Sequence, residues 1–337
     1  MSTYALGLGL GTRDSKGNWL EVFYPEPVLS PEGKVAELLG SFAHGNPIAS
    51  SDLETLADGA AALGATALET TARKMAQSDR NAVAVVLAED SAPSSVPEGY
   101  LKLHLLSHRL VKPQNVVLDG LFGVLPNVAW TSEGAIAIDE LAERQFAARL
   151  RGEVLEVSCI DKFPKMTNYV VPAGVRIAHT ARVRLGAYVG DGTTVMHEGF
   201  INFNAGTEGP GMIEGRVSAG VFVDAHSDLG GGSSTMGTLS GGGNIVISVG
   251  KNCLIGANAG LGIPLGDRCT IESGLYLTAG TKVQLLDADG VATERVSARA
   301  LAGVSDLLFR RNSLSGAVEC LTNKTAIELN EELHAHN

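Results

Sequence analysis

Aromatic side chains and charges are both scarce in this sequence. Aromatic residues make up 5% of the 337 residues and charged residues 19%, whereas 41 residues are glycine. Few bulky groups are therefore available to fill a thick core. The composition favours a fold with many tight turns and thin layers of aliphatic side chains.

Positive charge is also in short supply. The chain has 26 Lys and Arg residues against 37 Asp and Glu residues, which gives a net charge of −11. This balance argues against a general binder of nucleic acid or acidic membranes. An anionic ligand would need a local cluster of Lys, Arg or backbone N–H groups.

Long apolar runs are absent from the sequence. None reaches the ~18 residues of a membrane-spanning helix. The N-terminus also lacks a basic segment followed by an apolar one, which is the pattern of a secretion signal. We therefore expect no membrane span and a cytoplasmic location.

Cysteine is rare, and no metal or redox motif contains it. The four cysteines are widely spaced, with no C-x-x-C pair and no histidine at metal-binding spacing, which predicts free thiols in a reducing compartment. They are Cys159, Cys253, Cys269 and Cys320. No phosphate-binding loop, H-E-x-x-H motif or nucleophile elbow is present either.

Three early glycines, Gly7, Gly9 and Gly11, form a G-x-G-x-G pattern. A dinucleotide site would require a helix directly after it. Instead Pro25 and Pro27 follow soon. The pattern therefore does not favour a nucleotide-binding fold.

Strand and helix patterns alternate through residues 1–165, which predicts an α+β N-terminal domain. A Ser51-x-x-Glu54 capping box opens an alanine-rich helix that ends near Gln77. The other predicted elements are strands at 5–10, 18–24 and 82–87, a helix at 30–40, and a helix at 134–151 with Ile138, Leu141, Phe146 and Leu150 on one face.

A six-residue repeat begins at Val171. The apolar anchors are Val171, Ile177, Val183, Val189, Val195 and Ile201. Four positions after each anchor comes a small or apolar residue, namely Val175, Ala181, Ala187, Thr193, Gly199 and Ala205. This period fits a coil in which each unit forms one flat side and three units close a triangular turn of a parallel β-helix. The anchors would fill the lumen, and stacking of the coils would supply the stability.

The repeat is expected to extend over residues 166–284 with two interruptions. The first covers residues 207–212, after which the pattern resumes at Ile213 and Ala219, and the second is the glycine-rich segment 230–243. Loops that leave a rigid coil are a usual place for function. After the second break the anchors are Val249, Ile255 and Leu261, and then, with the phase shifted by two, Leu265, Ile271, Leu277 and Val283.

Residues 285–337 are predicted to form a small C-terminal appendage. A hairpin around residues 287–290 and strand-like sequence up to Leu308 are expected first. A polar helix is expected from about Thr325 onward.

Glu198 is the strongest candidate for a catalytic group. It lies between anchor Val195 and Gly199, so its side chain is expected to project out of the coil. Asn202 and Asn204 follow, and if they alternate along a strand their amides face one way. A carboxylate beside two amides makes a plausible polar site. The neighbouring His197 is the second candidate for a base.

Candidate ligand-binding groups follow Glu198 in the chain. Gly215 and Ser218 belong to a segment whose backbone N–H groups are available to a ligand, because glycine permits close approach to the main chain. Arg216, Lys251 and Lys282 are candidate partners for phosphate groups.

Four motifs together resemble the tetrahydrodipicolinate N-succinyltransferase family, in the branch with a long N-terminal domain. They are TTVMHEGFINFNAGT at 193–207, EGRVSAG at 214–220, MGTLSGGG at 236–243 and LIGANAGLG at 254–262. The resemblance implies a left-handed parallel β-helix, a homotrimer with active sites between subunits, and a role in lysine and diaminopimelate biosynthesis. It also implies that Glu198, which matches the glutamate of the family's MHEG motif, is the catalytic carboxylate.

The resemblance further implies transfer of succinyl from succinyl-CoA to the amine of a cyclic dicarboxylate. No tightly bound cofactor is expected, although some members carry a divalent cation such as Mg²⁺ near the three-fold axis, and no ligands for it can be matched in this sequence. The extended pantetheine arm would bond to backbone along the coil edges, at Gly241, Gly242, Gly243, Ala257 and Asn258. Glu198 as a general base and Glu198 as a nucleophile that forms a mixed anhydride both remain open.

Two other functions compete with this one. Another hexapeptide acyltransferase, acting on an amino sugar or an amino acid, would share the coil; only a dicarboxylate acceptor requires cationic groups near Glu198. A non-enzymatic scaffold or a carbonic-anhydrase-like metal protein is the third possibility. The latter would need several histidines on the coil faces, where only His179, His197 and His226 occur.

Overall fold

The computed structural model describes residues 3–237 and 245–322. The chain divides into two compact units, Met1–Val111 with Asn115–Pro164, and Lys112–Gln114 with Lys165–Asn337. Gly241, Gly242, Gly243 and the helix predicted from Thr325 lie outside the described residues. None of the helices in the described ranges combines the length and the hydropathy needed to cross a bilayer.

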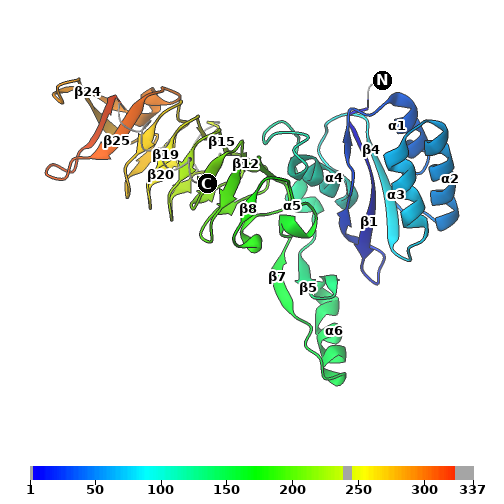
Figure 1. Ribbon diagram of the computed structural model, residues 1–337. Coiled ribbons are helices and arrows are strands. Elements are labelled where there is room, and N and C mark those ends of the chain that lie inside the picture. The colour runs from blue at the N-terminus through cyan, green and yellow to red at the C-terminus, as the bar shows by residue number, and fades with distance from the viewer. Residues whose placement is uncertain (1–2, 238–244, 323–337) are drawn as a thin grey trace. The chain divides into compact units, whose positions relative to one another are not determined.

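A four-stranded antiparallel sheet forms the centre of the first unit (Figure 1). Strand β1 pairs with β4 along one edge and with β2 and β3 along the other. The strands are β1 (Ala5–Arg13), β2 (Trp19–Phe23), β3 (Val28–Leu29) and β4 (Asn81–Leu87). Gly7 and Gly9 lie inside β1, where an added Cβ would come within 2.6 Å of Tyr24 and Val22 respectively. Gly7 and Gly9 therefore allow neighbouring side chains to pack closely against strand β1.

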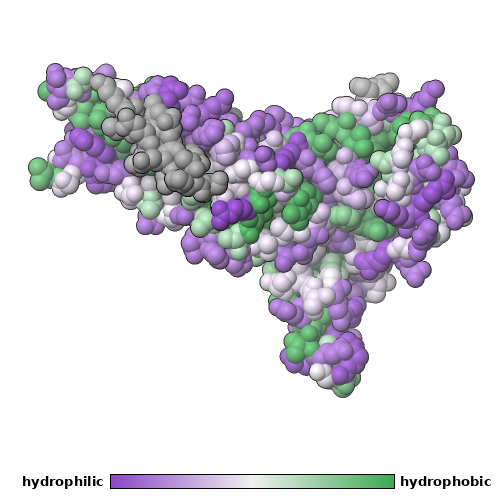
Figure 2. All heavy atoms as spheres, viewed as in Figure 1, coloured by the Kyte–Doolittle hydropathy of each residue, from purple (hydrophilic) through white to green (hydrophobic). Residues whose placement is uncertain are grey.

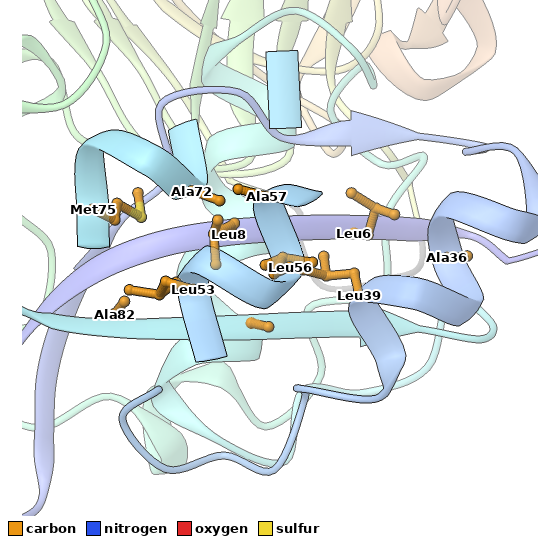
Figure 3. Close-up of a cluster of buried hydrophobic side chains, with 11 residues drawn as sticks. Leu6, Leu8, Ala36, Leu39, Leu53, Leu56, Ala57, Ala72, Met75 and Ala82 are labelled. Atoms are coloured by element: carbon orange, nitrogen blue, oxygen red, sulfur yellow. The ribbon is translucent and has the colours of Figure 1, made fainter. Parts of the chain in front are cut away.

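Helices cover both faces of this sheet. Helices α1 (Gly33–Gly40), α2 (Ser50–Ala62) and α3 (Thr66–Ala76) lie on one face, and α4 (Val96–Ser107) packs against β2 and β4. Apolar side chains from β1, β4 and the first three helices meet in one core (Figure 3). The capping box predicted at Ser51 is wrong, because the helix already begins at Ser50 after Ala49. The single long helix predicted there is two helices, separated at Gly64, which has a φ of +70°.

Helix α4 is buried on all sides and carries an unusual set of polar groups. The side chain of His104 is fully buried between the backbone of Tyr24 and that of Tyr100. The ammonium group of Lys102, also buried, forms an ion pair with Asp90. These polar groups are paired, as burial requires.

A smaller antiparallel sheet completes the first unit. Its order is β6 (Gly134–Ala137), β5 (Val128–Thr131), β7 (Val157–Asp161), and α6 (Ile138–Leu150) packs on it; the short helix α5 is Leu121–Val124. The helix predicted from Gly134 therefore begins four residues later, because residues 134–137 pair with β5. Four residues were predicted to form the apolar face of this helix. Leu141 packs on the core between the helix and the small sheet, whereas Ile138, Phe146 and Leu150 are exposed.

The second unit is a parallel β-helix with three sides, each of which is a parallel sheet. From β10 to β18, successive strands pass in turn from one sheet to the next, so each of these coils adds one strand to every side (Figure 1). The first side contains β8 (Arg176–Ile177), β10 (Thr193–Val195), β13 (Gly211–Ile213), β16 (Asp228–Leu229), β19 (Leu254–Ile255) and β21 (Thr270–Ile271). The second contains β11 (Phe200–Ile201), β14 (Arg216–Val217), β17 (Ser234–Thr235), β20 (Gly260–Gly262) and β22 (Tyr276–Thr278). The third contains β9 (Ala187–Val189), β12 (Ala205–Thr207), β15 (Phe222–Val223) and β18 (Ser248–Val249).

Most predicted anchors fill the lumen. Val183, Val189, Val195 and Ile201 are fully buried, as are the later anchors from Ile213 to Val283 that lie on strands. Val171 is an exception: 72% of it is exposed, so its prediction is wrong. Val171 stands eighteen residues before Val189 of β9, and β9 is the edge strand of its sheet within the part of the chain that the structure describes. Ile177, on β8 itself, is half-buried because β8 is an edge strand.

The predicted interruption at residues 207–212 is also wrong. Thr207 is buried at the anchor position of β12, and Ile213 follows it after six residues on β13. The hydroxyl groups of Thr207 and Thr193 are 2.8 Å apart, so one donates a hydrogen bond to the other inside the coil. The chain therefore passes through this segment as regular coil.

The next anchor is Val217 rather than the predicted Ala219. Phe200 pairs with Arg216, sixteen residues on, whereas Thr193 pairs with Gly211, eighteen residues on. The corner before β14 is thus two residues shorter.

The glycine-rich break also starts later than predicted, since Thr235 is a buried anchor on β17. The phase shift at Leu265 is confirmed, because Leu265 is buried and its N–H bonds to the carbonyl of Ser248.

Antiparallel strands close the far end of the β-helix. Strand β25 (Leu307–Arg311) pairs in parallel with β21 and antiparallel with β26 (Val318–Thr322), and β23 (Lys282–Leu286) forms a hairpin with β24 (Ala292–Ser297). The sheet order makes β24 the last strand. The hairpin turn at residues 287–290 is confirmed, but the domain boundary placed after residue 284 falls inside β23. Single-turn 3-10 helices lie at η1 (Met166–Asn168), η2 (Thr180–Arg182) and η3 (Ala298–Leu301).

Candidate active site

Glu198 lies at the corner between β10 and β11, and its side chain is exposed. The turn is closed by a hydrogen bond from the N–H of Gly199 to the carbonyl of Met196. A Cβ on Gly199 would lie 2.1 Å from the carbonyl oxygen of Ile213 in the next coil. Only glycine fits there, so this corner is tightly defined and Glu198 stands on its outer side.

Of two arginines in the preceding coil, Arg182 reaches this corner and Arg184 reaches the turn that follows β11. Arg182 donates from Nη2 to the carbonyl oxygen of Glu198 at 2.7 Å and from Nε to that of Gly199 at 3.3 Å. Arg184 donates from Nη1 to Oδ1 of Asn202 at 3.0 Å. Both arginines are half-buried and flank the lumen residue Val183. The corner of Glu198 is therefore held by the guanidinium group of Arg182, from the preceding coil.

Both guanidinium groups also approach the outward ring of Phe200. The Cζ atoms of Arg182 and Arg184 are 6.0 and 5.9 Å from its centroid, within the usual range of cation–π contacts. Phe200 is in register with Arg216 of the following coil. Arg182 and Arg184 thus lie near Glu198, and Arg216 lies on the following coil, in a chain whose net charge is −11.

Arg182 and Arg184 are functional candidates that the sequence analysis missed. The signal was present in the coil period, since Arg182 precedes Glu198 by sixteen residues and Arg184 precedes Asn202 by eighteen. These two coils pair at an offset of eighteen residues, as Val183 does with Ile201, so Arg184 lies opposite Asn202 and Arg182 lies beside the corner of Glu198. Residues so far apart in the chain are recognised as neighbours only when the repeat is wound into coils.

Asn202 and Asn204 do not alternate along a strand as predicted. Strand β11 ends at Ile201 and β12 begins at Ala205, so both asparagines lie in the turn between them. Asn204 has a φ of +49°, a backbone conformation that asparagine tolerates better than most residues. Its Oδ1 accepts a hydrogen bond from the N–H of Gln114 at 2.9 Å. Asn202 therefore belongs with the arginine cluster, whereas Asn204 holds the segment Lys112–Gln114 on the coil.

The next coil contributes Gly215, Arg216 and Ser218. Gly215 accepts from the N–H of Phe200 at 3.0 Å, and a Cβ there would lie 2.1 Å from Oγ of Ser233. Arg216 is exposed and donates from Nη2 and Nε to Oγ of Ser234 at 2.7 and 3.1 Å. The hydroxyl of Ser218 donates to the carbonyl of Thr235 at 2.7 Å. These groups tie β14 to β17.

Ala257 and Asn258 are exposed at the corner between β19 and β20, the same edge of the β-helix as Glu198. The N–H of Asn258 bonds to the carbonyl of Gly231, and the carbonyl of Ala257 accepts from Gly274. Lys282 is exposed at the start of β23, the strand that follows β22 in the chain. Lys251 is exposed too, and its N–H bonds to the carboxylate of Asp267.

His197 is exposed beside Glu198. Among residues 3–237 and 245–322, no three His, Cys, Asp or Glu side chains are grouped so as to hold a metal ion. The described part of a single chain thus assigns no ligands to the divalent cation that the sequence resemblance left open.

The four cysteines are free thiols, with Cys253 and Cys269 buried in successive coils. The face in view in Figure 2 is largely hydrophilic over the β-helix.

Family models match three parts of the chain. Residues 63–123 match the N-terminal region of tetrahydrodipicolinate N-succinyltransferase, and residues 125–165 match its middle region. Residues 246–279 match the hexapeptide repeat of succinyl-transferase. The first two matches fall in the first unit and the third falls in the β-helix.

Full-length relatives agree with these matches. The chain is 64% identical to the 2,3,4,5-tetrahydropyridine-2,6-dicarboxylate N-succinyltransferase of Pseudomonas putida, over 99% of this chain and 98% of the relative. It is 60% identical to the enzyme of that name from Vibrio cholerae, over 100% of both chains. The crystal structure of a Campylobacter jejuni protein, assigned as a 2,3,4,5-tetrahydropyridine-2-carboxylate N-succinyltransferase, superposes with a TM-score of 0.88 at 31% identity, covering 97% of this chain and 94% of the other. The chain therefore belongs to the tetrahydrodipicolinate N-succinyltransferase family.

Proposed function

We propose that this chain transfers a succinyl group from succinyl-CoA to the amine of 2,3,4,5-tetrahydrodipicolinate. Full-length relatives at 60% identity or more carry the name of this activity. The observation that carries the proposal to this chain is the exposed Glu198 at a corner whose backbone is held by Arg182, with Arg184 over the adjoining Phe200.

The arginine cluster favours a dicarboxylate acceptor. Arginine binds carboxylates through paired, charge-assisted hydrogen bonds. An amino sugar has no carboxylates to neutralise, so an enzyme for that substrate would gain nothing from the guanidinium groups of Arg182 and Arg184 near Glu198. The reading as an acyltransferase of amino sugars is therefore disfavoured.

Glu198 is positioned to handle the proton of the acceptor. A thioester is already activated, so the enzyme mainly has to orient the amine and remove its proton. The ring nitrogen of tetrahydrodipicolinate is an imine without a hydrogen, so water first adds across its C=N bond to give an amine. In the general-base route, Glu198 takes the amine proton as the new C–N bond forms, and the C–S bond then breaks to release the CoA thiolate. In the covalent route, Glu198 itself attacks the thioester and the amine attacks the resulting anhydride. Both routes require the carboxylate.

The donor would lie along the edge that Glu198 shares with Ala257 and Asn258. Backbone N–H groups at this edge and at Gly215 are candidates to stabilise the oxyanion and the pantetheine amides. Asn202, Asn204 and Ser218 complete the proposed substrate contacts, and Arg216 and Lys282 are proposed for the phosphates. Gly241, Gly242 and Gly243 remain part of the proposal from the sequence alone.

We further propose that the β-helix is left-handed and that the chain forms a homotrimer in the cytoplasm, with each active site completed by two chains. Hexapeptide coils are stable only when stacked, and Glu198 stands on an outer edge that a second chain would enclose. A divalent cation such as Mg²⁺ on the three-fold axis stays unassigned.

The test is a thiol-release assay. Succinyl-CoA and acetyl-CoA are each offered with tetrahydrodipicolinate or with 2-aminopimelate as acceptor. Acceptor-dependent release of CoA that is faster with succinyl-CoA is expected. Release that depends on an amino sugar, with none for either dicarboxylate, would overturn the proposal.

A further inference from the structure

A cavity of about 970 Å³ lies within the first unit. That volume is in the range of small-molecule sites. Its walls come from five parts of the chain, residues 13–20, 45–46, 94–97, 124–127 and 137–139. Of the residues proposed for acyl transfer, none that the structure describes lines it. The cavity is therefore built by the first unit alone.

Arg13 is held in one position at the wall of this cavity. Its guanidinium carbon lies 5.4 Å from the centroid of the Trp19 ring, and its Nε donates to the carbonyl of Gly17. The Trp19 ring is fixed in turn. Its indole N–H donates to the carbonyl of Gly45 at 2.8 Å, and a Cβ on Gly11 would come within 2.6 Å of the ring. The guanidinium group is thus positioned before any ligand arrives.

The acidic groups of the cavity already have partners. Both oxygens of the Asp14 carboxylate accept hydrogen bonds, from the N–H of Lys16 and from the N–H and side-chain amide of Asn18. Asp139 forms an ion pair with Lys16. Within residues 3–237 and 245–322, by contrast, no carboxylate pairs with Arg13, and its terminal nitrogens Nη1 and Nη2 form no hydrogen bond. Unused donors on a fixed cation select an anion.

Ile138 gives the same cavity an apolar wall. It was predicted to face the core, but it is 43% exposed and lines the cavity instead. The wall lies close to the turn that follows Arg13, because the N–H of Ser15 bonds to the carboxylate of Glu140 at 2.7 Å. Three further apolar residues, all half-buried, line the cavity, namely Val96, Val124 and Pro126. A ligand held by Arg13 would therefore also cover exposed apolar surface, which favours its binding.

We propose that this cavity binds a small organic carboxylate with an apolar body. Because Nε of Arg13 is engaged with Gly17, the edge that carries Nη1 and Nη2 is the one that meets the carboxylate, in the bidentate geometry typical of arginine. Of the described residues that line the cavity, Arg13 alone is cationic, so a monoanion fits better than a phosphate dianion. The apolar body lies against Ile138. The inference is independent of the proposed succinyl transfer, because it uses other residues.

The test measures the binding of two matched probes to the full-length chain by calorimetry. The probe 1-naphthaleneacetate has a carboxylate, and 1-naphthaleneacetamide has the same rings with a neutral amide. The wild type should bind the carboxylate about 10- to 100-fold more tightly, the equivalent of hydrogen bonds to a charged group. Arg13→Gln should abolish this difference by weakening only the carboxylate. Equal affinity of the wild type for both probes, no binding of the carboxylate at about 10 mM, or wild-type affinity in Arg13→Gln would overturn the inference.

Two further variants separate the parts of the site. Arg149→Gln removes an exposed arginine of the same unit that does not line the cavity, so it should bind both probes as the wild type does. Ile138→Ala should weaken both probes alike, about 3- to 10-fold, because it removes apolar surface and no charge. An unchanged affinity in Ile138→Ala would show that the naphthalene rings bind elsewhere.

Competition with CoA distinguishes this cavity from the proposed acyl-transfer site. An excess of CoA should leave the affinity for 1-naphthaleneacetate unchanged, and displacement of the probe by CoA would contradict the assignment to the first unit. Neither this competition nor the comparison of the two probes on the wild type needs a variant, so both decide the inference if Arg13→Gln does not fold. No step of the test uses the succinyl-transfer reaction, so a failure of that assay is a separate result.

Discussion

Arg182 and Glu198 are joined by a 2.7 Å hydrogen bond from a guanidinium nitrogen to a backbone carbonyl, across two successive coils. The bond involves the main chain of Glu198 and leaves its carboxylate free to face a substrate. The position of the carboxylate is therefore fixed by the register of the coils as well as by its own turn. Changes at Glu198 and at its supporting residues should have different kinetic consequences.

Replacing Glu198 with glutamine should remove the proton acceptor while conserving size and hydrogen bonding. We expect kcat to fall about 100-fold or more, as for the loss of a general base. The KM for succinyl-CoA should change little, because a group used only in the chemical step is removed. His197→Ala should cost much less. Loss of turnover in His197→Ala with near-normal activity in Glu198→Gln would reverse the two roles.

Arg184→Gln should weaken binding of the dicarboxylate acceptor. Loss of a hydrogen bond to a charged group costs about 1.5–3 kcal/mol, so the KM for the acceptor should rise about 10- to 100-fold. The KM for succinyl-CoA is the internal reference. Arg176→Gln, an exposed arginine on β8, is the matched control and should behave as the wild type. An unchanged acceptor KM in Arg184→Gln would show that the acceptor binds elsewhere.

The lumen prediction can be tested with one buried and one exposed anchor. Ile201 is fully buried, and Ile201→Ala should lower the free energy of unfolding by about 2–5 kcal/mol because it leaves a cavity. Val171→Ala, at a position 72% exposed, should stay within about 0.5 kcal/mol of the wild type. Urea unfolding at one fixed protein concentration measures both. Equal losses would contradict the assignment of Val171 to the surface.

His104 should make the first unit sensitive to mild acid. Burial lowers the pKa of His104 to about 3 and also lowers that of its stacked neighbour His108. In the unfolded chain a histidine has a pKa of about 6.5. The stability due to the neutral ring is therefore fully present above pH 6.5 and is lost as the pH falls toward 3, by up to about 1.4 kcal/mol per pH unit for one histidine.

Urea unfolding of the first unit at pH 7.5, 6.0 and 5.0 measures this slope. The variant His104→Asn removes the titrating group, so its free energy of unfolding should depend less on pH than that of the wild type, even if it is lower throughout. Equal slopes for the two proteins would mean that His104 is not the group responsible.

The proposed trimer has a consequence for dilution. If two chains complete each active site, specific activity should fall when the protein is diluted below the concentration at which the trimer dissociates. Sedimentation velocity at the same concentrations gives the mass of the species present. A monomer that is fully active at nanomolar concentration would contradict the shared site.

The β-helix was largely predictable because its core positions recur at a fixed spacing. The prediction failed where that spacing was carried by a polar residue, at Thr207, or where a corner was shortened, before Val217. A threonine inside a lumen looks like a break until its partner, Thr193, is known. At Val171 the spacing was right, but no neighbouring strand covers the side chain.

The candidate site was predictable only in part. Glu198 stands out because it falls at a corner of the repeat. Arg182 and Arg184 reach it across a coil, and such neighbours follow from winding the chain rather than from adjacent sequence. Asn204 was misread because its positive φ, which places it in a turn, is not visible in an alternating pattern.

The antiparallel strands at the end of the β-helix also decide how long the molecule can become. Strand β21 is followed in its sheet by β25, and the sheet ends at β24, whose Glu294 and Arg295 are exposed. A β-helix that stopped at β21 would offer a bare strand edge at the spacing of its own coils, onto which another molecule could add. Strand β24 is instead part of an exposed hairpin with β23 and carries charged side chains, which makes this edge less favourable for pairing with an incoming coil. The fold thereby protects itself against end-to-end polymerisation into filaments.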